Sequence, residues 1–297
     1  MRNCEYVLSC ESAADMTAEY FEKANIEYLP YHVAIDGREY LDDFGQSLPL
    51  ETFYSMIAAG AQTRTAQINI SEYADYFTPF LEKGMDVVHV CLSSGLTGAI
   101  NSARNAARIL EENFPDRKIY IVDSLAVSSG YGMLMDAAAE RRDAGMSADE
   151  LADWIEKNRL RVNHWFCSTD LSAYVRGGRI SKSAAVFGGV LEICPLMCID
   201  GQGRVSVKEK IRTKKRAMKE LVKRMEQSAE DGAEYSGKCY VGHSDCYDDV
   251  IALAEAIEQA FPNLKGKTEI YEVGTVIGAH TGGGSVGMFF WGNEREN

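Results

Sequence analysis

Two hydrophobic periodicities alternate along the first half of the chain. Short apolar runs typical of buried strands are separated by longer stretches in which apolar residues recur at helical spacing. This alternation predicts βαβ units around a mostly parallel sheet, and therefore an α/β fold class. The expected strands are Glu5–Ser9, Glu27–Ala34, Asp86–Leu92, Lys118–Val122 and His164–Ser168. The expected helices are Ala18–Ala24, Leu50–Ala59, Glu72–Lys83, Ala99–Asn113 and Ser128–Ala144.

The second half of the chain has a different pattern. Cys194–Ile199 and Arg204–Lys210 flank a short glycine-containing loop, which predicts a hairpin of antiparallel strands. The remaining periodic segments predict a compact α+β arrangement. These segments are helices Thr213–Gln227 and Asp248–Phe261 and strands Lys238–Gly242, Glu269–Val273 and Val286–Trp291.

We therefore expect an N-terminal α/β domain over residues 1–165 and a C-terminal α+β domain over residues 166–297. The segment Ser147-Ala-Asp-Glu150 predicts a capping box, because its serine and glutamate can satisfy each other's backbone donors. The helix that it opens runs through Lys157 and leads out of the first unit. A helix that crosses between the units would make the domains discontinuous.

Composition and charge narrow the function. The chain has 297 residues, of which 46% are hydrophobic and 25% charged, an ordinary globular composition. Its net charge of −13 disfavours nonspecific attraction to nucleic acid or to anionic membrane surfaces. No segment approaches the roughly 18 consecutive apolar residues of a membrane-spanning helix. Glu5 and Glu11 interrupt the apolar stretch that a signal peptide needs, so we expect a cytoplasmic location.

Cysteine and histidine spacing gives little support to metal or disulfide chemistry. None of the eight cysteines has a partner at CxxC spacing, and several lie in apolar, strand-like runs, which predicts reduced and mostly buried thiols. The segment His243-Ser-Asp-Cys246 contains ligand-type residues, but no second cluster at zinc-like spacing accompanies it. We expect no metal site.

The turn Ser93–Gly98 is the most informative motif. It directly follows the apolar run Val87–Leu92 and precedes the helix that begins near Ala99. Gly95 and Gly98 let the backbone approach a ligand, and the unpaired N–H groups and dipole at a helix start favour an anion. We expect an anion-binding turn, although one of its hydroxyls could instead serve only as the helix N-cap.

Three other segments carry polar groups that could meet a ligand. The hydroxyl-rich loop Gln62–Gln67 is either a ligand contact or a plain surface loop. Arg176 and Arg179 bracket two glycines and could face an anion or only solvent. The glycine-rich loop Gly278–Gly287 contains His280, whose imidazole can donate to a ligand, although a lone histidine is more often structural.

A basic run, Ile211–Lys219, stands out against the acidic background. It predicts either a solvated helix face or a surface that docks an acidic protein partner, since complementary patches raise association rates and fix register.

Six short motifs run in order along nearly the whole chain. They are Thr65–Gln67, Ser93–Gly98, Asp123–Ser124, Arg176–Arg179, Lys210–Thr213 and His280–Gly284. In this order the motifs resemble the DegV family of bacterial fatty-acid-binding proteins, which includes the lipid-carrying FakB subunits of fatty acid kinase. The resemblance implies a two-domain fold with a long-chain fatty acid in a buried tunnel between the domains and its carboxylate at their interface.

The resemblance also assigns roles to residues. Thr65 and Thr97, with Gly98 beside it, fall on the principal head-group contacts, and Arg176 and His280 fall on the polar network around the carboxylate. The basic face that we assign to docking of a kinase subunit contains Arg212, Lys214 and Lys215.

The chain departs from the family pattern at several motif positions. Alanine replaces a serine at Ala66, isoleucine a proline at Ile68, and glutamate an aspartate at Glu11. Thr97 replaces a serine and keeps the hydroxyl, so we expect head-group binding to survive. The hydroxyl that Ala66 lacks changes the details of the polar network.

The resemblance implies a carrier without stand-alone catalysis. It would hold a fatty acid while a separate ATP-dependent kinase phosphorylates the carboxylate. The expected partners are the fatty acid, the kinase subunit and, transiently, a membrane, with no nucleic acid and no cofactor other than the bound lipid. The alternative is an enzyme that acts on a small phosphorylated or acyl metabolite at the Ser93–Gly98 turn.

Overall fold

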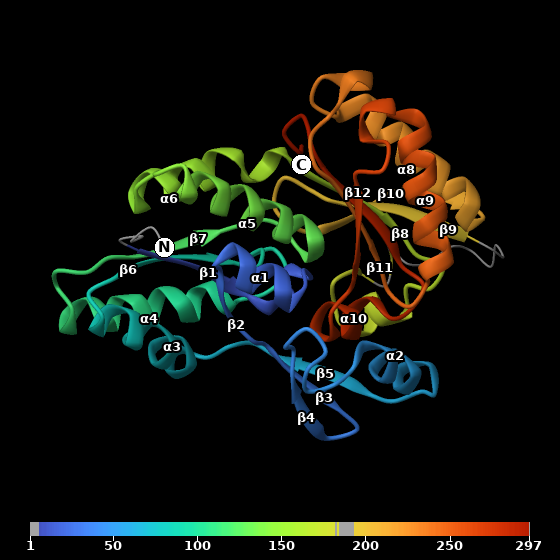
Figure 1. The fold of residues 1–297 in the computed structure, drawn as a ribbon. Helices are drawn as coiled ribbons and strands as arrows, with labels where there is room; N and C mark the ends of the chain where they lie inside the picture. Colours follow the sequence, from blue (N-terminus) through green and yellow to red (C-terminus); the bar gives the residue numbers. More distant parts are fainter. Residues whose placement is uncertain (1–5, 182, 184–192, 297) are drawn as a thin grey trace.

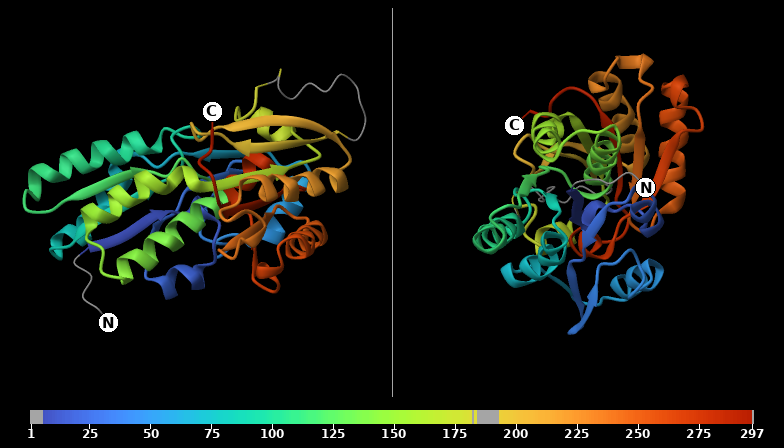
Figure 2. Two further views of the ribbon diagram at one scale, coloured as in Figure 1. Left: turned by 90° about the horizontal axis from the view of Figure 1, so that it is seen from above. Right: turned by 60° about the vertical axis from the view of Figure 1, so that its left-hand side comes forward.

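The structure, a computed structural model, describes residues 6–181, 183 and 193–296. The predicted first strand begins at Glu5, which lies outside the described residues, as does Cys4. Within the described part the chain folds into three sheets with helices packed around them (Figure 1). Seen from above, the four-stranded sheet of the first half lies towards one end of the molecule and the strands of the second half lie towards the other (Figure 2).

The first half contains a four-stranded parallel sheet in the order β2-β1-β6-β7. Helices α3 and α4 lie over one face, and α5 and α6 lie over the other (Figure 1). The strands are β1 (Tyr6–Glu11), β2 (Glu27–Leu29), β6 (Asp86–Cys91) and β7 (Ile119–Asp123). The helices are α1 (Ala18–Ala24), α3 (Ile70–Glu82), α4 (Ala99–Asn113), α5 (Ser128–Asp143) and α6 (Ala148–Asn158).

The second half contains a six-stranded sheet in the order β10-β9-β8-β13-β11-β12, antiparallel except for the β11–β12 pair. Helices α8 and α9 cover one face. The strands are β8 (Val162–Cys167), β9 (Ile193–Ile199), β10 (Val205–Arg212), β11 (Cys239–His243), β12 (Thr268–Glu272) and β13 (Val286–Trp291). The helices are α7 (Ser172–Arg176), α8 (Lys214–Ser228), α9 (Tyr247–Ala260) and α10 (Thr275–Thr281).

Helix α5 lies between the two larger sheets. It covers the four-stranded sheet together with α6 and also contacts β8, β11 and β13 of the six-stranded sheet. Nearly all of its residues are buried, which explains why its first twelve residues, apart from Asp136, are apolar or small on every side rather than amphipathic. The two halves therefore share one central helix.

A third, antiparallel sheet in the order β4-β3-β5 corrects part of the sequence-based prediction. The predicted strand Glu27–Ala34 is broken, because Pro30 lacks an N–H group and fixes its own φ, so β2 and β3 join different sheets. The predicted loop Gln62–Gln67 contains strand β5. The three strands are β3 (His32–Ile35), β4 (Arg38–Leu41) and β5 (Thr63–Ala66), and helix α2 (Leu50–Ala58) follows β4.

Several predictions at the level of elements are confirmed. The fold is α/β with a parallel sheet in the first half and a second, separate sheet in the second. The capping box is present, since Ser147 N–H donates to Glu150 Oε2 at 3.0 Å at the start of α6. The predicted glycine-rich loop Gly278–Gly287 is wrong at its beginning, where α10 continues to Thr281. The domain division at residue 165 stays a prediction, and it falls within β8.

Candidate ligand-binding site

A cavity of about 390 Å³ lies between the two halves of the molecule. This volume is within the range of about 300–1,000 Å³ that is usual for small-molecule sites. One side of the cavity comes from β5, the Ser93–Gly98 turn and the start of α5, and the other comes from the six-stranded sheet and α10. Most of its lining is apolar. The polar side chains that line it include Tyr31, Thr65, Thr97, Arg179 and His280.

Thr65 and His280 come from opposite sides of the cavity and contact each other. Thr65 projects from β5, where alternate residues are half-buried, and its Oγ1 lies 2.8 Å from Nε2 of His280 in the last turn of α10. Burial, and then the charge of Arg179, lower the pKa of His280 to about 4. The imidazole is therefore neutral near pH 7. Its Nδ1 is buried and has no hydrogen-bond partner in the described part of the chain.

The turn after α7 brings Arg179 to the cavity and leaves Arg176 outside. Arg176 ends α7 and is exposed, and it does not line the cavity. The chain then turns back at Gly178, whose φ of +74° favours glycine. The guanidinium of Arg179 donates to the carbonyl oxygen of Leu96 at 3.0 Å. The structure thus gives Arg179, rather than the predicted Arg176, the position of the cavity-facing cation.

Glycine is required between these two arginines for a steric reason. A Cβ atom built on Gly177 would lie 2.3 Å from Nδ1 of His280. The backbone of Gly177 also accepts a hydrogen bond from Arg179 at 2.6 Å. The absence of a side chain therefore lets the imidazole and the guanidinium pack against the same stretch of backbone.

Hydrogen bonds to two other segments of the chain hold the Ser93–Gly98 turn in place. Ser93 is fully buried and donates to the carbonyl oxygen of Gly203 at 2.8 Å. Asp123 accepts from the N–H of Ser94 at 3.1 Å. A Cβ atom on Gly95 would lie 2.5 Å from the carbonyl oxygen of Gln202, so this glycine is needed where the turn packs on the β9–β10 loop.

Thr97 has both of the roles that the sequence offered as alternatives, a contact with the helix start and a contact with the cavity. Its Oγ1 accepts the N–H of Ala99 at 3.2 Å, which satisfies one of the free donors at the start of α4. Its side chain also lines the cavity. Because a hydroxyl keeps a donor hydrogen after accepting one bond, Thr97 can still donate to a ligand. Gly98 and Gln67 line the cavity and are exposed, so this polar end reaches the surface.

Tyr31 is a cavity residue that sequence reasoning missed. It directly follows Pro30, its side chain is only 2% exposed, and its hydroxyl has no hydrogen-bond partner among the residues described. Burial, together with the charge of Glu11, raises the pKa of Tyr31 well above its usual value, so the hydroxyl is a donor. No local motif marks this position, because the tyrosine reads as an ordinary apolar strand residue.

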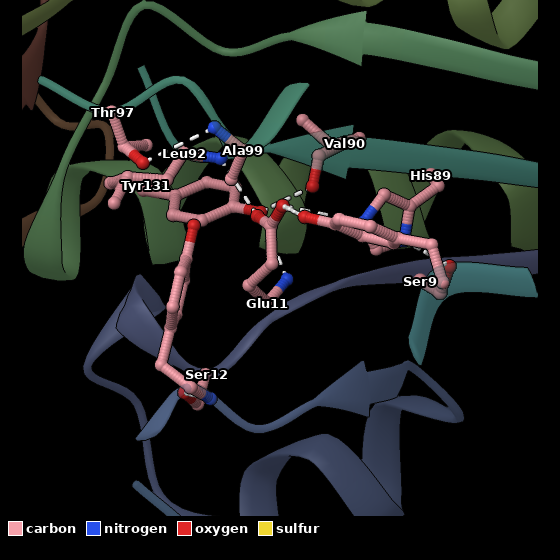
Figure 3. A network of polar contacts seen from close by, with 11 residues as sticks. Ser9, Glu11, Ser12, His89, Val90, Leu92, Thr97, Ala99 and Tyr131 are labelled. Atoms are coloured by element: carbon pink, nitrogen blue, oxygen red, sulfur yellow. Dashed lines mark hydrogen bonds and ion pairs between the residues drawn. The ribbon is translucent and has the colours of Figure 1, made fainter. Parts of the chain in front are cut away.

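A buried polar network centred on Glu11 lies beside the residue that precedes the Ser93–Gly98 turn (Figure 3). Glu11 accepts from the N–H of Leu92 at 2.7 Å and from the hydroxyls of Tyr73 and Tyr131 at 2.6 and 2.8 Å. Burial alone would raise the pKa of Glu11, but the imidazole of His89, whose Nε2 lies 3.5 Å from Oε1, and the hydrogen bonds from Tyr73 and Leu92 lower it below its usual value. The network thus fixes the end of β6, from which the turn departs.

The same network contains the one group of potential metal ligands found in the described residues. The donor atoms of Glu11, His89 and Cys91 lie within 4.8 Å of one another, and all three residues are buried. Both carboxylate oxygens of Glu11 already accept hydrogen bonds. The geometry therefore favours a structural polar network over a metal site.

The predicted docking residues do not all share one environment. Arg212 and Lys215 are exposed, as are Arg216 and Lys219 on the same run. Lys214 is only 16% exposed and forms a 2.6 Å ion pair with Asp249 of α9. The structure therefore leaves Arg212 and Lys215 available at the surface and places Lys214 in a contact between α8 and α9.

These features define an α/β protein that encloses a largely apolar cavity with a cluster of hydrogen-bond donors at one end. The comparisons with known proteins are more specific. The sequence model of the DegV family, which describes its members as uncharacterised proteins, matches residues 8–293, and this chain belongs to the DegV family. A DegV domain-containing protein of Clostridium perfringens is 33% identical over 98% of this chain and 99% of its own length.

Solved structures of DegV proteins have the same fold. A fatty-acid-binding DegV protein from Thermus thermophilus is 26% identical with a TM-score of 0.84, covering 97% of this chain and 99% of its own. A fatty-acid-binding DegV protein from Streptococcus agalactiae is 25% identical with a TM-score of 0.83, at the same coverage. The fatty acid kinase B3 protein of Streptococcus pneumoniae, solved with linoleic acid, is 20% identical with a TM-score of 0.81 and supports the fold alone.

Among the described residues, no helix is both long and apolar enough to span a membrane.

Proposed function

We propose that this protein binds a long-chain fatty acid in the cavity and presents its carboxylate to a separate kinase that forms the acyl phosphate. The observation that carries the proposal is the unpartnered hydroxyl of Tyr31, buried at the donor-rich end of an otherwise apolar cavity. A buried donor left without a partner costs about 1–3 kcal/mol, so this end is built for an acceptor such as a carboxylate.

The carboxylate would meet several donors at once. The hydroxyls of Tyr31, Thr65 and Thr97 can each donate one hydrogen bond, and Arg179 adds a positive charge nearby. Hydrogen bonds to a charged group contribute about 1.5–3 kcal/mol each. The head group therefore supplies orientation and selects against neutral lipids. His280 is neutral before binding, and a carboxylate beside it would raise the pKa of the imidazole.

The apolar lining would supply most of the affinity. Burial of roughly 14 methylenes at about 0.8 kcal/mol each gives a gross apolar contribution of about 11 kcal/mol, before the costs of ordering. The free thiols of the described cysteines suit the reducing cytoplasm, where we place this function. The exposed residues at the polar end would let a kinase reach the carboxylate while the tail stays buried.

The enzyme alternative at the Ser93–Gly98 turn has no comparable support. Ser93 is fully buried and its hydroxyl is engaged with Gly203, while His280 is paired with Thr65. The two groups thus do not form a nucleophile and base pair in this arrangement. Turnover of a soluble metabolite by the purified protein alone would favour the alternative.

Mass spectrometry of organic extracts from gently purified protein tests the proposal, and we expect about one fatty acid per chain. The variant Thr97→Val loses a donor to the carboxylate, so its fatty acid affinity should fall about tenfold or more. Thr97→Ser keeps the hydroxyl and is the matched control, with an affinity close to that of the parent. Full fatty acid occupancy in Thr97→Val would overturn the assigned head-group site.

A further inference from the structure

Two glycines lie side by side in the floor of the cavity. Gly242 on β11 and Gly287 on β13 are directly opposed in the antiparallel register, and both line the cavity. Opposed residues of an antiparallel pair point to the same face of the sheet, so neither strand supplies a side chain of its own at this point of the face. Glycine inside a strand weakens the sheet and often marks a place where a ligand approaches the backbone.

Aromatic side chains lie over this pair of glycines, and the ring of Phe289 is close to both of them. Gly287 also opposes Phe166 on β8, and Phe289 follows two residues later on the same face of β13. A methyl group on Gly242 would lie 3.3 Å from Phe289 Cε2, and one on Gly287 would lie 3.2 Å from Phe166 Cβ. Both distances are shorter than the optimum of about 3.5–4.0 Å for carbon atoms. We call this feature the glycine trough, defined by Gly242, Gly287, Phe166 and Phe289.

The glycine trough and the donor-rich end belong to one cavity but to different elements. The donors come from β5, the Ser93–Gly98 turn and the segments around Tyr31, Arg179 and His280. The trough is part of the six-stranded sheet, and residues at the start of α5, including Val127, line the same cavity. An acyl chain held by its carboxylate at the donor-rich end would extend through the rest of the same cavity, which the trough lines.

We propose that the glycine trough sets the length of acyl chain that the protein accepts. Because Gly242 and Gly287 have no side chain, Phe166 and Phe289 can lie close to the sheet, and a methyl group added at either position would push an aromatic side chain into the cavity and shorten the space for the acyl chain. This inference rests on the proposed fatty acid function and deepens it by naming its specificity-determining residues.

The test measures dissociation constants of delipidated Gly242→Ala and Gly287→Ala for a series of saturated fatty acids from octanoate to stearate. Chains too short to reach the trough should bind within about twofold of the parent, and longer chains should bind about tenfold or more weakly, because overpacking costs about 1–3 kcal/mol. Gly283→Ala is the matched control, since its Cβ would have only ordinary contacts, the nearest at 3.8 Å.

A second measurement uses the parent protein, so that it does not depend on the folding of a variant. A long-chain fatty acid with a photoreactive diazirine at its terminal carbon should label peptides that contain Phe166 or Phe289. A diazirine next to the carboxylate should label near His280 instead. Fragmentation must locate the modified residue, because His280 and Phe289 lie on one stretch without lysine or arginine.

The outcomes separate the two proposals. Equal weakening of every chain length in both alanine variants, no weakening at any length, or terminal labelling away from the trough would overturn the trough while the fatty acid function stands. A parent protein that binds no fatty acid of any length would overturn the proposed function, and the trough with it.

Discussion

Single residues decide the chemistry of the site. The two arginines around Gly177 are an example, because only one of them lines the cavity. Arg176 and Arg179 are equally plausible cavity cations in the sequence, since each flanks the same two glycines. In the structure Arg179 lines the cavity, whereas Arg176 is exposed to solvent. Their directions depend on the end of α7 and the positive φ of Gly178, which the spacing of the motif does not specify.

Substitution of Gly177 tests this packing directly. Gly177 has φ −73° and ψ −10°, a conformation open to any residue, so alanine there adds only a methyl group. That methyl group would lie 2.3 Å from Nδ1 of His280 and must displace the imidazole from Thr65. We expect Gly177→Ala to bind fatty acid about tenfold or more weakly, because such overpacking costs about 1–3 kcal/mol.

Isothermal titration with palmitate checks this expectation, with Gly283→Ala as the control that adds a methyl group in ordinary contact. Parent-like affinity in Gly177→Ala would mean that the position of His280 does not govern binding.

At the scale of elements, α10 shows how tertiary contacts replace a local signal. Its sequence has no N-cap side chain, and its glycines suggest a loop. Two carboxylates from distant segments cap it instead. Asp15 accepts from the N–H of Gly274 at 3.0 Å, and Asp42 accepts from the N–H and hydroxyl of Thr275 at 2.9 and 2.7 Å. These contacts hold the helix that carries His280.

Titration of Asp15 should therefore be visible in the stability of the protein. Burial, and then the charge of Asp42, raise the pKa of Asp15 well above 3.8. Between 3.8 and the raised value the folded state binds more protons than the unfolded state, so this group stabilises less as pH rises. The variant Asp15→Asn cannot titrate at this position, so its free energy of unfolding lacks this dependence on pH. The free energy of unfolding of the parent minus that of the variant should therefore fall from pH 4 to pH 8.

Chemical denaturation across this pH range measures the difference, at about 1.4 kcal/mol for each unit by which the two pKa values differ. The exposed Asp116→Asn variant controls for a general loss of charge and should track the parent. A constant difference between parent and Asp15→Asn at every pH would contradict a raised pKa for this carboxyl.

On the scale of the whole molecule, the chain has a net charge of −13 but also an exposed basic group that contains Arg212 and Lys215. If this group docks the kinase, Arg212→Glu with Lys215→Glu should raise the KM of the kinase for the loaded protein about tenfold. Fatty acid occupancy should not change, because neither residue lines the cavity. The effect should weaken at high salt, since contacts between exposed charges are screened.

Kinase assays on matched loaded proteins measure this KM, with Lys83→Glu and Lys157→Glu together as the control, since both residues are exposed and the net charge changes by the same amount. Lys157 is 76% exposed, so its substitution changes the net charge without touching the basic group. An equal change in KM for the control would assign the effect to overall charge rather than to docking.

The sequence by itself determined the elements whose signals are local. Helix α4 follows from its apolar spacing, α6 from its capping box, and the Ser93–Gly98 turn from its place between an apolar run and an amphipathic helix. The resemblance of six motifs in register identified the family, which the comparisons confirm. These features depend on neighbours within a few residues, so they can be read along the chain.

Only the tertiary structure decided how distant segments combine. Strand β5 looks like a loop because its polar residues gain their partners from β3 and α10, and Lys214 looks like a free surface cation until Asp249 of α9 pairs with it. Tyr31 becomes a candidate ligand contact only because the folded chain buries its hydroxyl without a partner among the described residues. The opposition of Gly242 and Gly287 likewise depends on strand register. Such relations arise from packing across the chain, which local sequence patterns do not encode.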